Sequence, residues 1–330
     1  MARSVVCALL IGVVLAGCQR DKPEPPVPTA TVAVPAAPQQ APPQPARPQS
    51  LAEARQAFNS SLRSQSSPRT PLAVAPPEVF RTISYDSAVG KLAAYLSPDP
   101  QDGKKHPAIV WITGGDSNTI GDVWSPAPAN NDQTAAAYRQ AGIIMMFPSL
   151  RGGNENPGRK EGFLGEVDDV LAAADYLARL DYVDPDRIYL GGHSTGGTLA
   201  LLVAESSGRF RAVFSFGPVD EIDGYGSEHL PFDTTRPAER ELRSPGRWIS
   251  SITSPTFVFE GADQGNMVPL IRMQAASTNP KVSFIAVENA THFSVLAPIN
   301  RLVASKILQD TGPATNLTFP DSAIRAALAH

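Results

Sequence analysis

The residues best suited to chemistry in this sequence are a serine and the glycines around it. Residues 192–196 read Gly-His-Ser-Thr-Gly, after a short apolar run at 187–190 and before an apolar run of helix formers. This G-x-S-x-G spacing is typical of a nucleophile elbow, a sharp turn from a strand into a helix. Glycine is needed two residues before and after the serine, because a Cβ there would clash with the neighbouring strand and helix. The turn would hold the Ser194 hydroxyl clear as a nucleophile for acyl transfer.

Two other interpretations of this segment remain open. A phosphate-binding loop needs G-x-x-x-x-G-K-[ST], and Gly191, Gly196 and Thr198 fit that pattern. The lysine position is occupied by Gly197, so a nucleotide site is disfavoured. A purely structural glycine-rich turn would leave the same pattern. The choice depends on what flanks the segment.

Composition excludes several function classes. The 330 residues carry a net charge of −4 with no basic block, so nothing indicates nucleic-acid binding. The only two cysteines, Cys7 and Cys18, precede residue 20 and leave no disulfide or cysteine metal site in the rest of the chain. No cluster of metal ligands is visible. We therefore expect neither a metal nor another cofactor.

The N-terminal segment has the features of an export signal. An apolar run from Val5 to Ala16 is too short for a comfortable membrane span and ends in Leu-Ala-Gly-Cys at 15–18. This ending resembles the lipobox of bacterial lipoproteins, which implies cleavage after residue 17 and a lipid on Cys18. Gln19 then favours the outer membrane, facing the periplasm. A plain secretory signal is the alternative.

The segment 18–77 is predicted to be a Pro/Ala-rich tether, since it lacks apolar periodicity apart from one short amphipathic helix within 50–65. From about residue 78 to 310, strands alternate with helices, which predicts βαβ crossovers and a mostly parallel sheet. Residues 219–250 have no clear periodicity and are predicted to form a cap. The tail at 311–330 is expected to be loosely held. Asp168 and Asp169 are expected to be solvated carboxylates at the start of a helix.

Several motifs resemble the catalytic domain of the prolyl oligopeptidase (S9) family of α/β-hydrolases. They are Arg-Gly-Gly at 151–153, Leu-Asp-Tyr-Val-Asp-Pro-Asp-Arg-Ile at 180–188, Gly-Gly-His-Ser-Thr-Gly-Gly at 191–197, Ser-Pro at 244–245, Ile-Thr-Ser-Pro at 252–255 and Thr-His-Phe at 291–293. The resemblance implies an α/β-hydrolase fold over most of 78–310, with helices on both faces of the sheet and a small cap insertion. No β-propeller is expected, since the tether is too short for one.

The resemblance also implies an acid and a histidine after the serine, in that order. Of the five histidines, only His292 lies in a loop behind the last predicted strand, and we expect it to be the general base. Asp263 follows the preceding strand and is the expected acid. Val-Pro comes five residues after it rather than the family's three, so Glu260 stays open as the alternative. The expected oxyanion donors are the backbone N–H groups of Thr195 and Gly115.

The function expected from these features is a lipid-anchored serine hydrolase of the cell envelope, acting on a small ester or a short peptide or amide. Glu221, Asp223 and Glu228 in the predicted cap could hold the amine of an exopeptidase substrate. The alternative is a catalytically silent hydrolase fold that serves as a binding or scaffold lipoprotein. The sequence specifies neither the acyl group nor the oligomeric state.

Overall fold

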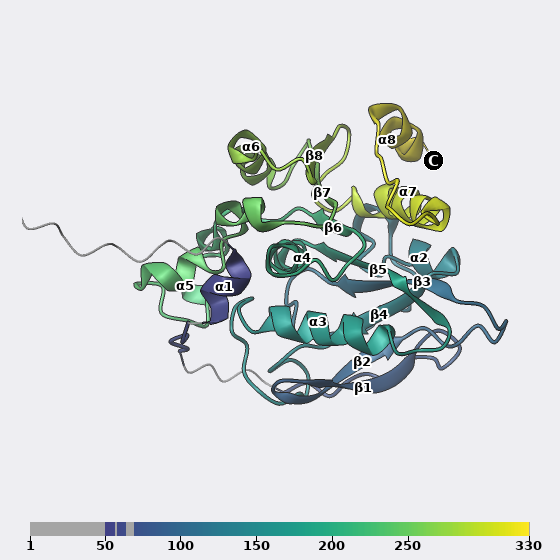
Figure 1. Ribbon diagram of the computed structural model, residues 1–330, viewed down its shortest axis with the longest axis horizontal. Helices are drawn as coiled ribbons and strands as arrows, with labels where there is room; N and C mark the ends of the chain where they lie inside the picture. The colour runs from purple at the N-terminus through teal and green to yellow at the C-terminus, as the bar shows by residue number, and fades with distance from the viewer. Residues whose placement is uncertain (1–49, 57, 64–68, 330) are drawn as a thin grey trace, which may run out of the picture. The chain divides into compact units, whose positions relative to one another are not determined.

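The computed structural model describes residues 50–56, 58–63 and 69–329 (Figure 1). The predicted signal peptide, Cys18 and most of the tether lie outside these residues. Among the helices of the described part, none has the length and apolar character needed to cross a membrane.

One sheet organises the described residues. Its strand order is β1-β2-β4-β3-β5-β6-β7-β8. The pairs β1–β2 and β2–β4 are antiparallel, whereas every pair from β4 through β3 to β8 is parallel, as the sequence predicts. The strands are β1 (Arg81–Ser87), β2 (Gly90–Leu96), β3 (His106–Ile112), β4 (Ile144–Pro148), β5 (Val183–His193), β6 (Val213–Phe216), β7 (Thr256–Gly261) and β8 (Val282–Val287).

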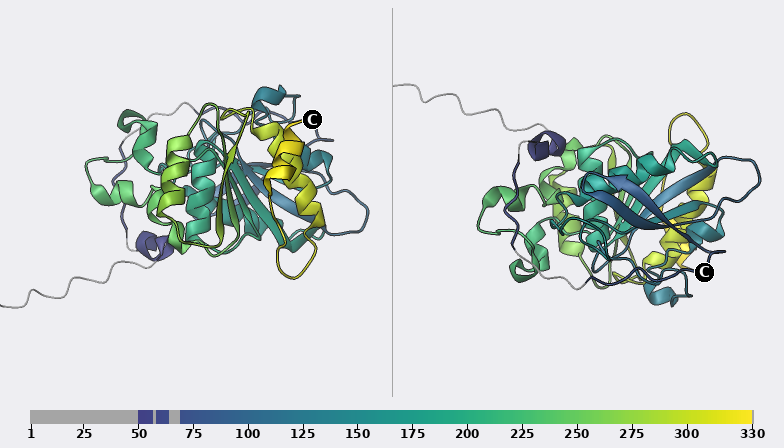
Figure 2. Two further views of the ribbon diagram at one scale, coloured as in Figure 1. Left: turned by 90° about the horizontal axis from the view of Figure 1, so that it is seen from above. Right: turned by 90° about the horizontal axis from the view of Figure 1, so that it is seen from below.

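Helices cover both faces of this sheet (Figure 2). Alternate residues of β3 belong to opposite hydrophobic cores, with Val110 in one and Trp111 in the other. The Val110 core contains α3 (Glu166–Leu177), α4 (Thr195–Ser206) and α6 (Met267–Ala276), and the Trp111 core contains α2 (Ala137–Gln140), α7 (Leu296–Gln309) and α8 (Asp321–Leu328). The remaining helices are α1 (Leu51–Gln56) and α5 (Pro237–Glu241), with 3₁₀ turns at Ala129–Asn131, Ile222–Tyr225, Ser227–His229, Pro245–Arg247 and Ile249–Ser251.

Asp169 is not the solvated carboxylate that the sequence suggests. It is fully buried, and both of its oxygens accept from Arg151, at 2.9 Å from Nε and 3.0 Å from Nη2. A third guanidinium nitrogen donates to Glu161 at 2.6 Å. These carboxylates raise the pKa of Arg151 despite its burial. The arginine of the Arg-Gly-Gly motif therefore has a structural role between the loop after β4 and α3. Asp168 is half exposed and pairs with Arg55 at 2.8 Å.

The C-terminal tail is held more firmly than expected. Asp310 accepts from Arg211 Nε and from Tyr189 Oη, each at 2.7 Å, which fixes the end of α7. Farther along, the ring of Phe319 packs edge-on against Phe257, with centroids 4.7 Å apart. The tail therefore completes the Trp111 core, and it owes its order to these tertiary contacts rather than to local periodicity.

A buried carboxyl in α4 leads to a prediction about stability. Glu205 is 1% exposed, and neither of its oxygens has a hydrogen-bond partner among the described residues. Burial raises its pKa well above the usual value, so the folded state keeps the proton. The unfolded chain loses that proton above about pH 4.3, so the folded state becomes relatively less stable as pH rises through that value.

Glu205→Met is therefore expected to stabilise the protein by about 1–3 kcal/mol at pH 8, and by less at pH 4. Thermal unfolding at the two pH values checks this, with the exposed Glu288→Met as the control. An equal gain at both pH values would contradict the proposed protonation difference.

Candidate active site

Ser194 lies at a strained turn between β5 and α4. Its backbone angles are φ 55° and ψ −113°, and its N–H donates to the Phe216 carbonyl of β6 at 2.7 Å. A Cβ on Gly192 would lie 2.4 Å from the Gly196 carbonyl oxygen, and one on Gly196 would lie 2.2 Å from that of Ile112. These clashes are the physical reason for both glycines of the motif. A positive φ at a non-glycine residue is costly and persists because the surrounding structure enforces it.

His292 comes from the loop between β8 and α7 and is paired with a buried carboxylate. Its Nδ1 lies 3.1 Å from Oε2 of Glu260, the last residue but one of β7. Glu260 is fully buried, and its two oxygens also accept the backbone N–H groups of Gly261 at 2.8 Å and Asn266 at 2.9 Å. The carboxylate therefore fixes the imidazole with Nδ1 as the donor. Nε2 is then free to act as a base.

The prediction that Asp263 is the acid is wrong. Asp263 is exposed, and its N–H donates to the Ala290 carbonyl, while its carboxylate makes no hydrogen bond to His292 in the described residues. Pairing with β8 keeps the chain in strand conformation through Gly261, and the following loop folds back so that Asn266 reaches Glu260. Asp263 is left on the outer side of this loop. Glu260, the alternative from the sequence, is the carboxylate that contacts His292.

Neighbouring backbone segments bring the histidine to the elbow. Gly217 directly follows Phe216, whose carbonyl accepts the Ser194 N–H, and a Cβ on Gly217 would lie 2.4 Å from Cε1 of His292. The rings of His193 and His292 have centroids 4.5 Å apart. Ser194 and His292 thus lie at the same edge of the sheet, where the parallel strands end.

His193 has a positioning role that the sequence did not reveal. Its Nε2 lies 3.0 Å from the His292 carbonyl, and its Nδ1 lies 2.8 Å from Nε2 of Gln133. Burial, followed by the nearby charge of His292, lowers the pKa of His193 to about 3, so the ring is neutral. A neutral ring can donate from Nε2 and accept at Nδ1. Gln133 Oε1 in turn accepts the Gly114 N–H at 3.3 Å, which links the histidine loop to the glycine loop after β3.

The predicted oxyanion donors lie on adjoining segments. Thr195 is the first residue of α4, where helix geometry leaves its N–H without an intrahelical acceptor. Its hydroxyl donates to the Gly115 carbonyl at 2.9 Å. A Cβ on Gly114 would lie 2.8 Å from Nδ1 of His193 and 3.3 Å from Cβ of Ser194, so glycine lets this loop approach the nucleophile. The two segments that carry the predicted donors therefore contact each other beside Ser194.

A cavity of about 250 Å³ adjoins these two donors. We refer to it as the acyl pocket. Its lining residues are Gly115, Asp116, Ser117, Asn118, Lys160, Gly162, Phe163, Thr195, Tyr225, His229, Leu230 and Pro231. Lys160 is paired with Asp116 at 2.6 Å, so these two charges of the lining offset each other.

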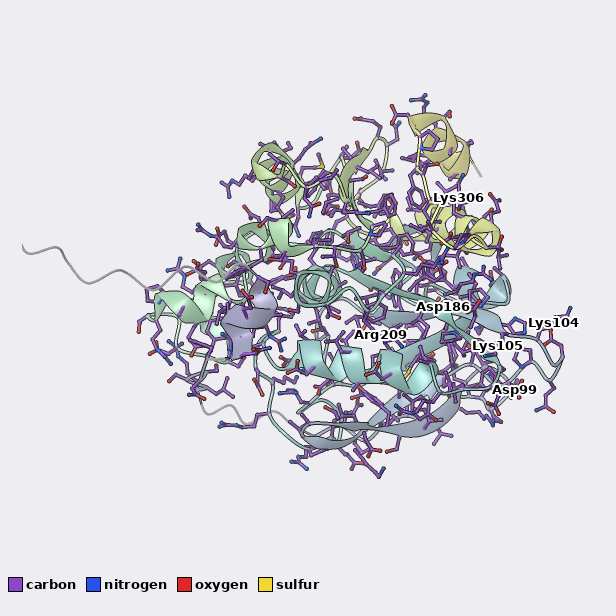
Figure 3. All side chains as sticks on the ribbon, in the orientation of Figure 1. Asp99, Lys104, Lys105, Asp186, Arg209 and Lys306 are labelled. Carbon is purple, nitrogen blue, oxygen red and sulfur yellow. The ribbon has the colours of Figure 1, made fainter. Side chains whose placement is uncertain are left out.

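A larger cavity of about 940 Å³ lies at the opposite ends of the strands and is lined by residues such as Asp186 and Arg209 (Figure 3). It includes the start of β5 and the segments that precede β6, β7 and β8. Ligands of parallel sheets bind at the carboxyl ends of the strands, which favours the smaller pocket for catalysis.

The cap does not offer the free carboxylates expected for an exopeptidase. Glu221 pairs with Arg247 at 2.7 Å, and Asp223 pairs with Arg240. Glu228 lies 3.6 Å from the neighbouring His229. Each acid therefore already has a basic neighbour, and none of the three lines the acyl pocket.

Comparisons with known proteins match part of the chain. Residues 130–255 match the model of the prolyl oligopeptidase family, a segment that includes Ser194 and ends before Glu260. Dipeptidyl peptidase 8 of Homo sapiens is 29% identical over 161 residues, which are 44% of this chain and 17% of that protein. The dual function macrocyclase-peptidase POPB of Galerina marginata is 34% identical over 123 residues, covering 35% of this chain and 16% of that protein. The chain thus spans about a sixth of the length of these relatives.

Solved structures share the fold at low sequence identity. The acylaminoacyl peptidase of Pyrococcus horikoshii superposes with a TM-score of 0.59 and 15% identity, covering 74% of this chain and 43% of that one. An esterase of Pyrobaculum calidifontis superposes with a TM-score of 0.50 and 17% identity, covering 70% of this chain and 85% of that one. The α/β-hydrolase fold predicted from the sequence is confirmed.

Proposed function

We propose that the chain, whose residues 130–255 match the model of the prolyl oligopeptidase family, is a serine hydrolase that acts through Ser194, His292 and Glu260. The observation that carries this proposal is the contact of the buried Glu260 with His292, whose ring lies against the backbone beside the elbow. A carboxylate in that position orients the imidazole and stabilises its protonated form.

The reaction follows from these positions. His292 Nε2 accepts the Ser194 proton as the serine oxygen attacks the substrate carbonyl. The developing oxyanion is stabilised by the N–H groups of Thr195 and Gly115, each contributing about 3–4 kcal/mol to the transition state. His292 then protonates the leaving group. In the second half of the reaction, His292 takes a proton from water as the water attacks the acyl-enzyme, and it returns that proton to Ser194.

We propose a small ester or a short peptide or amide as the substrate. The acyl pocket has about 250 Å³, which suits a single apolar side chain or a short acyl chain. Apolar lining from Phe163, Tyr225 and Leu230 supports an uncharged acyl group. The paired acids of the cap support an ester or a blocked peptide over a substrate with a free amine.

A fluorophosphonate probe tests the proposal directly, because it reacts only with an activated serine. The wild-type protein is expected to be labelled at one site, Ser194→Ala to lose labelling completely, and the control Ser305→Ala to keep it. Hydrolysis of nitrophenyl esters compared with aminoacyl anilides would then separate esterase from peptidase activity. An unlabelled wild-type protein would instead favour a silent scaffold.

A further inference from the structure

Residues 50–56 and 58–63, which the sequence suggests are part of a tether, pack against the hydrolase domain. We call the described residues of this segment the strap. Leu51 at its start is fully buried in the same core as α3 and α4. Figure 1 shows α1, which begins at this residue, on the side of the sheet that α4 covers. The strap is therefore part of the folded domain, and its contacts converge on the acyl pocket.

One end of the strap is bonded to residues 230–233, which form one wall of the acyl pocket. Leu62 forms an antiparallel bridge with Phe232. In this bridge Arg63 N–H donates to the Pro231 carbonyl at 2.8 Å, and Asp233 N–H donates to the Ser61 carbonyl at 2.9 Å. Pro231 and its neighbour Leu230 line the pocket. The strap thus fixes the backbone of that wall from behind.

The other wall, at 161–164, is also bonded to the strap. Arg55 Nη2 donates to the Leu164 carbonyl at 2.7 Å. Leu164 adjoins Phe163, which lines the acyl pocket. A Cβ on Gly162 would lie 2.9 Å from Cε1 of Phe232, so the two walls meet closely behind the pocket.

A buried ion pair joins the strap to both walls. Arg243 and Glu239 are each fully buried, with Nη1 and Oε2 2.6 Å apart. Ser60 Oγ donates to Glu239 at 2.9 Å and accepts from Arg243 Nη2 at 2.8 Å. Arg243 Nε also donates to the Glu161 carbonyl at 2.9 Å, and its guanidinium carbon lies 4.0 Å from the Phe232 ring centroid. Burying two charges is costly unless their remaining donors and acceptors are satisfied, and Ser60 supplies part of that satisfaction.

We propose that the strap is a specificity element, which sets the size of the acyl group by holding the 161–164 and 230–233 walls in place. The inference rests on the proposed serine hydrolase function and adds a residue-level determinant of its substrate range. Leu230 and Pro231 can contact an acyl group only while their backbone is fixed, because these residues are not part of a regular strand. A short acyl group does not reach these residues and is insensitive to their position.

Arg63 offers a matched pair of variants. Arg63→Pro removes the N–H that bonds to Pro231, while its effect on Leu62 favours the extended backbone that the bridge already has. Arg63→Ala keeps that N–H and removes only the side chain, whose contacts with Asp233 at 3.8 Å and Thr234 at 3.5 Å are weak and exposed. Ser60→Ala is a second, milder variant that removes the hydroxyl bonded to Glu239 and Arg243, while the Ser61 N–H keeps its hydrogen bond to Glu239.

The experiment measures phosphonylation rate constants for alkyl fluorophosphonates of increasing chain length in the full-length protein. Arg63→Pro is expected to react about tenfold more slowly than Arg63→Ala with the chain that fills the pocket, and within twofold of it with the shortest chain. Ser60→Ala should show the same pattern with a loss of about threefold. Identical chain-length profiles for Arg63→Pro and Arg63→Ala would overturn the proposal.

Failure of the proposed function would appear differently. If no probe labels the wild-type protein, the hydrolase assignment fails. Amide hydrogen exchange at 232–233 then tests whether the strap holds the backbone of this wall in place. Faster exchange in Arg63→Pro than in Arg63→Ala would support a fixed wall. Equal exchange would refute it. Circular dichroism of each variant establishes that the domain is folded in both comparisons.

Discussion

Replacing His292 by alanine is expected to lower kcat for a short nitrophenyl ester by about 10⁶-fold. Without the imidazole, nothing at the elbow accepts the Ser194 proton or returns it to the leaving group. His193 cannot substitute, because it is buried, its lowered pKa of about 3 makes it a poor base, and both its ring nitrogens are engaged. Steady-state kinetics on purified protein measures the effect.

His106→Ala is the matched control for this prediction. His106 begins β3 at the opposite end of the sheet and pairs with Asp102 at 3.0 Å. Its loss is expected to change kcat by less than twofold. Retention of more than a hundredth of the wild-type activity in His292→Ala, in a folded protein, would show that His292 is not the base.

The elbow and the parallel sheet could be predicted because their signals are local. Glycine is required at 192 and 196 because a Cβ there would clash with the adjoining turn or with β3. The spacing of these two glycines therefore indicates the bend directly in the sequence. The apolar runs of the parallel strands are likewise encoded residue by residue. The loop position of His292 could also be predicted, because this histidine follows the last strand directly in the chain.

The acid was harder to predict because it depends on where a strand ends. Glu260 faces His292 only because pairing of β7 with β8 continues through Gly261, and sequence patterns locate strand ends to within a few residues at best. Glu260 and Asp263 are three positions apart, which is within that uncertainty, so the sequence alone could not separate them. The bonds among Gln133, His193 and His292 join residues far apart in the chain, and no local pattern signals them.

The packing of the strap and of the C-terminal tail on the domain was not predicted, for a related reason. The sequence indicates a short amphipathic helix in the strap, but neither segment carries a local signal that it packs against the sheet. Their order comes from tertiary contacts, such as those of Ser60 with the buried Arg243–Glu239 pair and of Phe319 with the phenylalanines of β6 and β7. Such contacts depend on surfaces that exist only after the sheet has formed.

Glu260→Gln is expected to lower kcat by about 10⁴-fold and to leave fluorophosphonate labelling slow but detectable. The amide preserves the volume of the side chain but presents an NH₂ group to one of three donors, the N–H groups of Gly261 and Asn266 and Nδ1 of His292. It also removes the negative charge that stabilises the imidazolium in the transition state. The loss is smaller than for His292→Ala because the base itself remains.

Asp263→Asn is the control that separates the two carboxylates. Asp263 lies only three positions from Glu260, in the same loop region, and it is exposed. Its substitution is expected to change kcat by less than twofold, because no contact with His292 is lost. The ratio of the two effects is therefore the informative quantity. Comparable losses would show that the 261–266 loop rearranges to bring Asp263 to the histidine, whereas a 10³-fold or greater difference would establish a Ser-His-Glu triad whose acid is supplied by the strand itself.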